Sequence, residues 1–419
     1  MPFHRIAESI SQVCSTGRLL ATVFADCFYF PANSEGDHVR ILIVGGGMAG
    51  WTLAGLLHRR GITPTIVERV GEYSRVGFWI GLYPFSANTL RETGGYDRYA
   101  KGSLAQEHYV MRDSEGYDLQ DMSFAEVLGR IHGFMGGLQR ADLLDILRDG
   151  GAGADLRMGM TVTALEQSDD VVHVTFSDAT TGEFDVVLAC DGIHSATRTL
   201  LTGDAREGLT DWGYTAFTWW APRQDAVANN CVEFWGAGGL FGLYPLTDRI
   251  NAIAGMPTPK GLPDMTPEQI VTAVREHFAD YPEPVRTALE HAADDTVFPW
   301  AMVDQKAKDW IHGRVALVGD AATGFLPTAG VGASNAIKSA AVLADELGRA
   351  DAATIPLALR LWEQRSRDRV EANQAASRKL AKMMFVKGHT VAKVRDTMLK
   401  HYPVEKVAKD VLHSNTHAW

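Results

Sequence analysis

Hydrophobic and polar residues follow different periods in different parts of the chain. Residues 39–44 form a short run rich in β-branched residues, and the short segments 187–191 and 314–318 are mainly apolar. Such runs are typical of buried parallel strands. The segment 48–60 has the spacing of an amphipathic helix and stops at Gly61. Beyond residue 333 the apolar stripes again have helical spacing. These patterns predict an α/β protein whose last part is helical.

The middle of the chain has another pattern. Four of the ten tryptophans lie between Trp212 and Trp235, within stretches such as GYTAFTWWAP and CVEFWGAGGLFGLYPL. Their β-branched, aromatic and glycine residues predict antiparallel strands. An aromatic sheet is therefore expected between the α/β segments.

Composition narrows the class of protein. A chain of 419 residues with 46% hydrophobic residues predicts two or three domains. The net charge of -11, without a long basic run, argues against nucleic acid and favours a small-molecule partner. The four cysteines are widely spaced and no histidine pair has zinc spacing, so reduced thiols, a cytoplasmic location and no metal site are expected. Residues 1–38 contain an apolar stretch too short for a membrane span, and their role stays open, as does the oligomeric state.

The first strand leads into a glycine-rich turn. Gly45 permits the turn, Gly47 allows close approach of a pyrophosphate, and Gly50 lets the helix pack on the strand, while Met48 and Ala49 begin the helix. Glu68 ends the second strand about 20 residues on, where a carboxylate accepts ribose hydroxyls. The order predicts a bound dinucleotide and fits NAD and FAD equally.

Two later segments bear on that choice. The strand at 314–318 ends in Gly319-Asp320, at the edge where open α/β sheets bind ligands. A loop with Pro327, Gly330, Val331 and Gly332 then enters a helix and directs backbone N–H groups toward a ligand. The strand from residue 187 ends in Asp191-Gly192, which is also compatible with an ordinary turn.

With these motifs in order, the chain resembles the single-component FAD-dependent monooxygenases, the aromatic hydroxylases with a p-hydroxybenzoate-hydroxylase-like fold. The resemblance covers about residues 39–377. It implies FAD contacts at the glycine-rich turn, at Glu68 with the adjacent Arg69, and at Asp320 with the loop that follows. It also implies a shared role in binding FAD and nicotinamide for Asp191-Gly192, which Ser195 and Arg198 complete, and an arginine near the flavin, here Arg140.

The resemblance implies a domain organisation. A Rossmann-type, GR2-like FAD-binding domain would be assembled from residues 39–105, 137–205 and 296–348. An inserted antiparallel β-sheet substrate domain would comprise 106–136 and 206–295, and 349–419 would form a C-terminal helical region.

The implied activity is NAD(P)H- and O2-dependent hydroxylation of an aromatic, polyketide-like or other electron-rich small molecule through a C4a-hydroperoxyflavin. Three alternatives remain. A flavin-dependent halogenase would carry a W-x-W-x-I-P signature, which FTWWAP only approaches. A reductase or dehydrogenase of the same fold, and a non-catalytic flavin-binding protein, are the others.

Candidate substrate contacts follow from the aromatic sheet, which covers the flavin in the family. Trp220, Phe234 and Phe241 are candidates for a flat apolar pocket, and Tyr214 and Tyr244 are candidates to assist ionisation of a phenol. Phe78 and Trp79 stand where the family has small residues. Either the backbone that faces the flavin is shifted here, or the two rings form an aromatic wall that narrows the pocket. We favour a place in the pocket for Trp79.

Overall fold

The computed structural model describes residues 39–73, 77–129, 133–293 and 296–401. The N-terminal extension 1–38 and the end of the C-terminal region lie outside the described residues. Within the described part of the chain, no helix is both long and apolar enough to cross a membrane.

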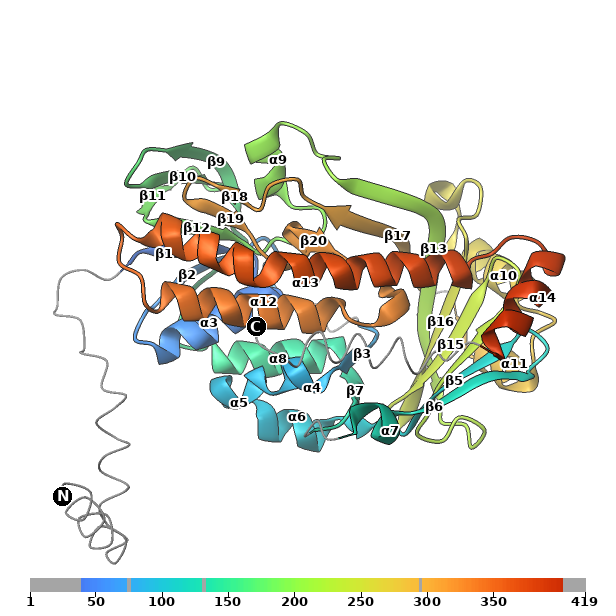
Figure 1. The fold of residues 1–419 in the computed structure, drawn as a ribbon. Helices are drawn as coiled ribbons and strands as arrows, with labels where there is room; N and C mark the ends of the chain where they lie inside the picture. Colours follow the sequence, from blue (N-terminus) through green and yellow to red (C-terminus); the bar gives the residue numbers. More distant parts are fainter. Residues whose placement is uncertain (1–38, 74–76, 130–132, 294–295, 402–419) are drawn as a thin grey trace, which may run out of the picture. The chain divides into compact units, whose positions relative to one another are not determined.

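A six-stranded sheet forms one half of the fold (Figure 1). Its central strands are parallel and almost wholly buried, as their apolar sequences require. The strand order is β18 (Ile311–His312), β19 (Val315–Leu317), β12 (Val186–Ala189), β1 (Ile41–Val44), β2 (Thr65–Glu68) and β8 (Asp155–Met158). Val187 pairs with Val315, so the two segments predicted as buried parallel strands, 187–191 and 314–318, lie side by side in one sheet.

Helices with long apolar stripes pack around this sheet. They are α3 (Met48–Arg59), α8 (Arg140–Gly150), α12 (Gly332–Leu347) and α13 (Ile355–Met384). Helix α12 packs against both α3 and α13. Figure 1 shows α13 running from the six-stranded sheet toward the eight-stranded sheet. Gln374 of α13 donates to the backbone oxygens of Gln305 and Gly324, so this helix is joined to the second sheet by buried hydrogen bonds.

The second large sheet has eight strands. Their order is β20 (Thr323–Gly324), β17 (Phe298–Lys306), β13 (Leu209–Pro222), β16 (Arg249–Pro257), β15 (Leu240–Pro245), β14 (Cys231–Trp235), β5 (His108–Asp113) and β6 (Asp118–Ser123). All neighbours are antiparallel except β14 and β5. The predicted aromatic sheet is therefore present.

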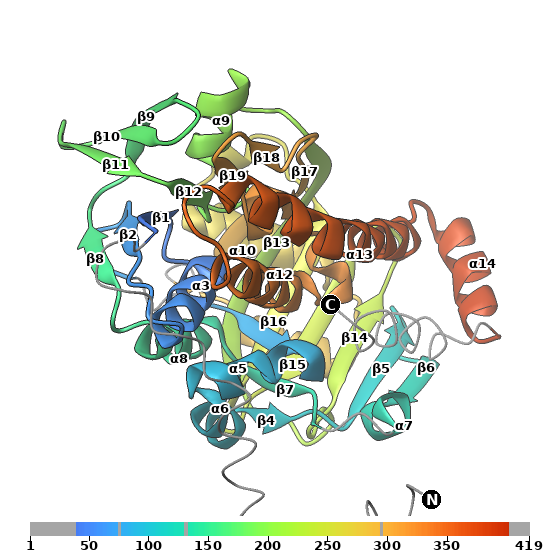
Figure 2. The same ribbon diagram turned by 60° about the vertical axis from the view of Figure 1, so that its left-hand side comes forward.

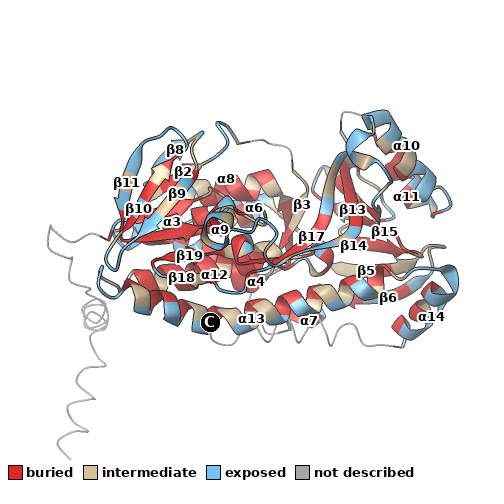
Figure 3. Cartoon of the chain, turned by 90° about the horizontal axis from the view of Figure 1, so that it is seen from above, coloured by how far each residue is buried: buried red, intermediate tan, exposed pale blue. Residues whose placement is uncertain are grey.

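Side chains alternate between the two faces of this sheet. One face packs against α10 (Pro267–His277) and α11 (Glu283–Glu290) in a closed apolar core, which we call the closed face. Helices α10 and α11 lie beyond the sheet in Figure 3, with β3 on its other side. The opposite face, which we call the open face, carries several half-buried aromatic side chains.

Two small sheets and several short helices complete the described fold (Figure 2). The sheets are β3 (Trp79–Leu82), β7 (Gly136–Gln139) and β4 (Leu104–Ala105), and β11 (Thr181–Phe184), β10 (Val172–Phe176) and β9 (Val162–Gln167). The helices are α4 (Pro84–Ala87), α5 (Thr89–Thr93), α6 (Tyr96–Gly102), α7 (Phe124–Leu128), α9 (Ala196–Thr202) and α14 (His389–Leu399). The predicted mixed α/β architecture, with an antiparallel sheet and C-terminal helices, is confirmed.

Candidate active site

The turn between β1 and α3 excludes side chains at two of its glycines. Gly45 has a φ of 102°, and a Cβ there would lie 2.6 Å from the carbonyl oxygen of Cys190. A Cβ at Gly50 would lie 2.0 Å from the carbonyl oxygen of Gly45. At Gly47 the nearest atom would be 3.9 Å away, so this side of the turn is open. Met48 and Ala49 begin α3, and the turn therefore fits a phosphate-bearing ligand at the start of the helix.

Glu68 stands at the end of β2 beside this turn. Its Oε2 accepts a hydrogen bond from the Gly46 N–H at 2.8 Å, and its Oε1 accepts one from the Val70 N–H at 3.0 Å. The carboxylate is thus oriented by backbone donors and keeps lone pairs for further hydroxyl donors. Arg69 follows it with an exposed side chain.

Arg140 and Asp320 lie within electrostatic reach of each other. Arg140 is the first residue of α8, and Asp320 lies in η2 (Gly319–Ala321), directly after β19. Desolvation raises the pKa of Asp320 to about 6, and the charge of Arg140 opposes the rise. Desolvation also lowers the pKa of Arg140, with Asp320 opposing. The Asp320 side chain nevertheless has an exposed surface. Asp320 is therefore surrounded by protein on most sides and open to solvent on one, and we infer that it lies at the bottom of a cleft beside Arg140.

The loop after β20 borders α12. It contains η3 (Pro327–Ala329), followed by Gly330 with a φ of 61° and by Val331, and Gly332 begins α12. A Cβ at Gly330 would have no neighbour within 4 Å, so the loop has an open side. The opposite side is fixed, because Thr328 Oγ1 donates to the Ser377 backbone oxygen of α13 at 2.8 Å.

Tyr83 holds the same loop from the β3 side. Its hydroxyl donates to the Ala329 backbone oxygen at 3.1 Å, and its N–H donates to Ser334 Oγ at 3.2 Å. Burial raises the pKa of Tyr83 to about 12, so the phenol stays protonated and remains a donor at neutral pH.

Hydrogen bonds hold the Asp191-Gly192 segment to the start of α9 and to η2. Asp191 accepts hydrogen bonds from the Ser195 hydroxyl at 2.5 Å and from the Thr197 N–H at 2.9 Å. Arg198 is fully buried and donates to the backbone oxygens of Ile193 and Ala321. The arginine therefore fixes this segment against η2, where Asp320 is located.

A short connection joins the cleft to the open face of the eight-stranded sheet. The Arg140 N–H donates to the Phe78 backbone oxygen at 2.9 Å, and the Phe78 ring lies 5.0 Å from that of Trp300 on β17. The Trp79 N–H donates to Asn251 Oδ1 on β16 at 3.0 Å. The residues predicted near the cofactor and those predicted near the substrate are thus linked by direct contacts.

Trp79 lies flat between β7 and the open face. Its ring is stacked on that of Tyr244, with centroids 5.0 Å apart and planes 24° apart. A Cβ at Gly137 would lie 2.2 Å from its Nε1, and one at Gly81 would lie 2.7 Å from the indole. The two glycines therefore make room for the ring. Its buried Nε1 has no hydrogen-bond partner among the described residues.

A buried carboxylate that sequence reasoning missed lies beneath Tyr244. Glu233 Oε1 accepts from the Tyr244 hydroxyl at 2.6 Å, and Oε2 accepts from the Tyr109 hydroxyl at 2.5 Å and from Trp235 Nε1 at 2.8 Å. The alternation in CVEFW was the available signal, because a period of two places Glu233 on one face with Cys231 and Trp235.

Three predicted pocket or catalytic residues need correction. Phe234 and Phe241 are 1% and 0% exposed, on the closed face against α10 and α11, because they alternate with Glu233 and Gly242 along their strands. Tyr214 is buried against Phe385, and its hydroxyl donates to the Phe385 backbone oxygen. All three are packing residues. Trp220 is half-buried, and the guanidinium carbon of Arg249 lies 4.4 Å from the centre of its ring.

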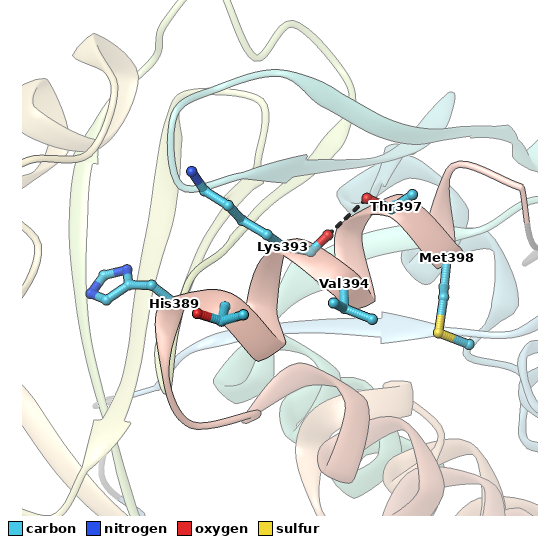
Figure 4. Close-up of a pocket in the computed structure, with 6 residues that line it drawn as sticks. His389, Lys393, Val394, Thr397 and Met398 are labelled. Atoms are coloured by element: carbon cyan, nitrogen blue, oxygen red, sulfur yellow. Dashed lines mark hydrogen bonds between the residues drawn. The ribbon is translucent and has the colours of Figure 1, made fainter.

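Two surface hollows lie away from this arrangement. One is lined by a single face of α14, including His389, Lys393, Val394 and Met398 (Figure 4). The other lies beside α8 and is lined by residues such as Tyr73 and Arg148. Neither is lined by Asp320, Glu233 or Tyr244. No group of three or more His, Cys, Asp or Glu residues suited to a metal ion occurs in the described ranges.

Comparisons with known proteins agree with this geometry. The family model described as "FAD binding domain" matches residues 38–358. A 3-amino-4-hydroxybenzoate 2-monooxygenase of Streptomyces platensis is 32% identical over 81% of this chain and 87% of its own length. A 6-hydroxynicotinate 3-monooxygenase of Pseudomonas fluorescens is 27% identical over 81% of this chain and 90% of its own length.

A solved structure has a similar fold. HpxO of Klebsiella pneumoniae, complexed with FAD and uric acid, superposes with a TM-score of 0.82 at 24% identity and covers 91% of this chain and 97% of its own. Its fold is that of the FAD-binding hydroxylases.

Proposed function

The chain belongs to the FAD-binding-domain family of flavin-dependent monooxygenases that act on aromatic substrates, and from this premise we propose that it uses NAD(P)H and O2 to hydroxylate a ring bearing a hydroxyl group. The observation that carries the proposal is the contact of the Arg140 and Asp320 cleft, through Phe78 and Trp79, with the half-buried aromatic open face. A flat ring held there would lie between the cofactor and the sheet.

The described residues fit FAD. The turn at Gly45 to Gly50 would take the pyrophosphate, Glu68 the adenosine ribose, and Asp320 a ribityl hydroxyl, with Arg140 nearby. The loop from Pro327 to Gly332 and the start of α12 would face the flavin ring with free N–H groups. When bound, FAD accepts electrons from NAD(P)H and activates O2 for transfer of one oxygen atom to the substrate.

The protein's own contribution is to hold the ring and exclude water. Trp79 and Trp220 offer apolar surfaces, and Tyr83 keeps the loop closed against β3. Tyr244, whose hydroxyl points to a carboxylate, is the residue we assign to substrate ionisation.

Arg249 provides a place for an anionic ring substituent. Its guanidinium lies over Trp220 and donates to Gln139 Oε1 at 2.8 Å. Its Nε lies 3.8 Å from the exposed Asp248 carboxylate and makes no hydrogen bond within the described residues. Relatives named for 3-amino-4-hydroxybenzoate and 6-hydroxynicotinate act on hydroxylated aromatic acids. We propose the same class of substrate here.

The test is NAD(P)H oxidation by the FAD-loaded protein with a panel of hydroxylated aromatic acids, aminophenols and polyketides under ¹⁸O2. We expect one class to stimulate oxidation and to yield a product that contains one ¹⁸O atom. A product without ¹⁸O would instead indicate a reductase or dehydrogenase, and halogen incorporation in the presence of halide would indicate a halogenase.

A further inference from the structure

The hydrogen bonds around Glu233 determine what the open face offers a ligand. A tyrosine hydroxyl has one proton and two lone pairs. Tyr109 and Tyr244 both donate their proton to Glu233, which is only 5% exposed, whereas both tyrosines are half-buried. The accessible polar groups are therefore phenol oxygens that can accept a hydrogen bond. A ligand that donates one, such as a ring hydroxyl, is the chemical complement.

A carboxylate in this position is costly for the fold. Moving an ionised carboxylate out of water destabilises the fold unless the charge is well paired, and apolar residues of similar size often give the same stability. Here three neutral donors satisfy the charge. Burial raises the pKa of Glu233 above its usual range, and those hydrogen bonds only partly oppose the rise. A buried ionisable group with a shifted pKa beside a cleft is typical of a functional site.

We propose that Glu233 is the proton acceptor of the site, and that Tyr244 relays to it the hydroxyl proton of a phenolic substrate. This inference rests on the proposed hydroxylase function. The substrate O–H bond breaks as a new Oη–H bond forms on Tyr244, and the original Tyr244 proton moves to Glu233 Oε1. The negative charge passes from Glu233 to the substrate oxygen, so protons and charge balance without another reactant. The resulting phenolate is the more electron-rich form of the ring.

The geometry favours Tyr244 over Tyr109 as the relay. Trp79 is stacked on Tyr244 and is joined through Phe78 to Arg140, so Tyr244 is the tyrosine nearer to the proposed cofactor site. Tyr109 and Trp235 both donate to the other carboxylate oxygen, Oε2. They are positioning residues, because they orient the carboxylate and leave Oε1 to Tyr244.

The raised pKa of Glu233 suits this role. Proton transfer from a phenol to a carboxylate becomes less favourable as the difference between their pKa values grows, and burial of the Glu233 carboxylate narrows that difference. The titratable neighbours are Tyr109 on β5, Cys231 on β14 and Tyr244 on β15, with Tyr83 beyond Cys231. Burial raises the pKa of each of these four groups, so they stay protonated at neutral pH and leave the negative charge of the cluster on Glu233.

The experiment compares Glu233→Gln with the unmodified FAD-loaded protein, using 3-amino-4-hydroxybenzoate as the probe substrate. Glutamine keeps the shape and still accepts hydrogen bonds but takes no proton at this pH. We expect kcat to fall roughly 10²-fold or more, the range of general base catalysis, and the acidic limb of the pH profile to disappear. Tyr244→Phe should behave alike and serves as the second variant if Glu233→Gln folds poorly.

A binding measurement separates this inference from the proposed function. The 4-nitrophenolate anion is yellow, so a difference spectrum against ligand-free protein reports the ionised fraction of bound 4-nitrophenol without turnover. We expect more anion in the unmodified protein than in Glu233→Gln at the same pH. If no substrate is hydroxylated but this difference persists, the proposed function fails while the proton acceptor stands.

Glu107→Gln is the matched control, because it makes the same carboxylate-to-amide change at an exposed glutamate directly before β5, outside the Glu233 cluster. It should keep the acidic limb and the nitrophenolate spectrum. The inference is overturned if Glu233→Gln keeps both while folding normally, or if Glu107→Gln loses both to the same extent.

Discussion

The closed face of the eight-stranded sheet contains Phe217, Trp219, Phe234 and Phe241, each at most 1% exposed and packed against α10 and α11. The open face also contains aromatic rings. Trp235 is fully buried there, but Tyr109, Trp220, Tyr244 and Trp300 are only half-buried. Both faces are formed by the same strands. The difference in burial therefore comes from the alternation of side chains along each strand and from the elements that pack against each face.

Aromatic content alone therefore does not identify a substrate site in this fold. On the closed face, rings meet edge to face, as Trp219 does with Phe241, and no space is left for a ligand. On the open face, the rings surround a buried carboxylate and adjoin the cleft of Arg140 and Asp320. Partial exposure combined with a costly polar group distinguishes the functional face.

The adjacent residues Trp219 and Trp220 give the sharpest test of this comparison, and the largest expected effect. Trp219→Ala should reduce the free energy of unfolding by about 3–5 kcal/mol, because it leaves a cavity and removes the hydrogen bond from Nε1 to the Ala288 backbone oxygen. Trp220→Ala should cost about 1 kcal/mol, mainly the contact with Arg249. Urea denaturation of both variants measures the difference.

Equal losses of unfolding free energy in the two variants would mean that Trp220 is packed as tightly as Trp219. The proposed difference between the open and closed faces would then be wrong. A loss of substrate binding for Trp220→Ala, with near-normal unfolding, would strengthen it.

The next largest effect is expected at the cleft that adjoins the open face. Asp320→Ala should weaken FAD binding roughly ten- to a hundred-fold, since a charge-assisted hydrogen bond contributes about 1.5–3 kcal/mol. The flavin absorbance retained after dialysis measures it. Asp309→Ala, at an exposed aspartate nearby in the chain, is the control and should keep FAD. An Asp320→Ala protein that retains a full complement of FAD would remove this residue from the site.

Trp79 tests how the open face excludes water. Trp79→Gly removes the ring stacked on Tyr244, so we expect more H2O2 formed per NAD(P)H oxidised and little change in melting temperature. Trp79→Phe keeps an aromatic wall and should stay better coupled. A strongly lowered melting temperature with an unchanged coupling ratio would instead assign Trp79 to the core.

The sequence predicted the parts of this site that depend on local backbone chemistry. Gly45 and Gly50 are required by contacts with neighbouring backbone, and such positions are readable from spacing. The assignment of Phe234 and Phe241 was wrong because alternation defines two faces but does not say which one meets the cofactor. Glu233 was missed because its partners Tyr109 and Tyr244 come from strands that only the sheet order brings beside it.

The smallest expected effect is a pH dependence confined to the cleft. The folded-state pKa of Asp320 is raised from 3.8 to about 6, so the folded protein holds this proton more tightly than the unfolded chain does. The slope of stability with pH is then negative in this window, and the FAD-free protein should lose stability between about pH 4 and pH 6 through this group. Asp320→Asn lacks the titration, so its melting temperature relative to the unmodified protein should rise across the window. Because the Asp320 side chain is exposed and water screens its charge, we expect this rise in melting temperature to be less than about 2 °C.

Trp219→Ala, which changes only the apolar closed face, is the control. Its melting temperature should differ from that of the unmodified protein by the same amount over the whole pH range. If the difference in melting temperature between Asp320→Asn and the unmodified protein is equally constant, Asp320 does not titrate in the cleft. The open and closed faces would then differ in the exposure of their side chains but not in the ionisation of neighbouring groups.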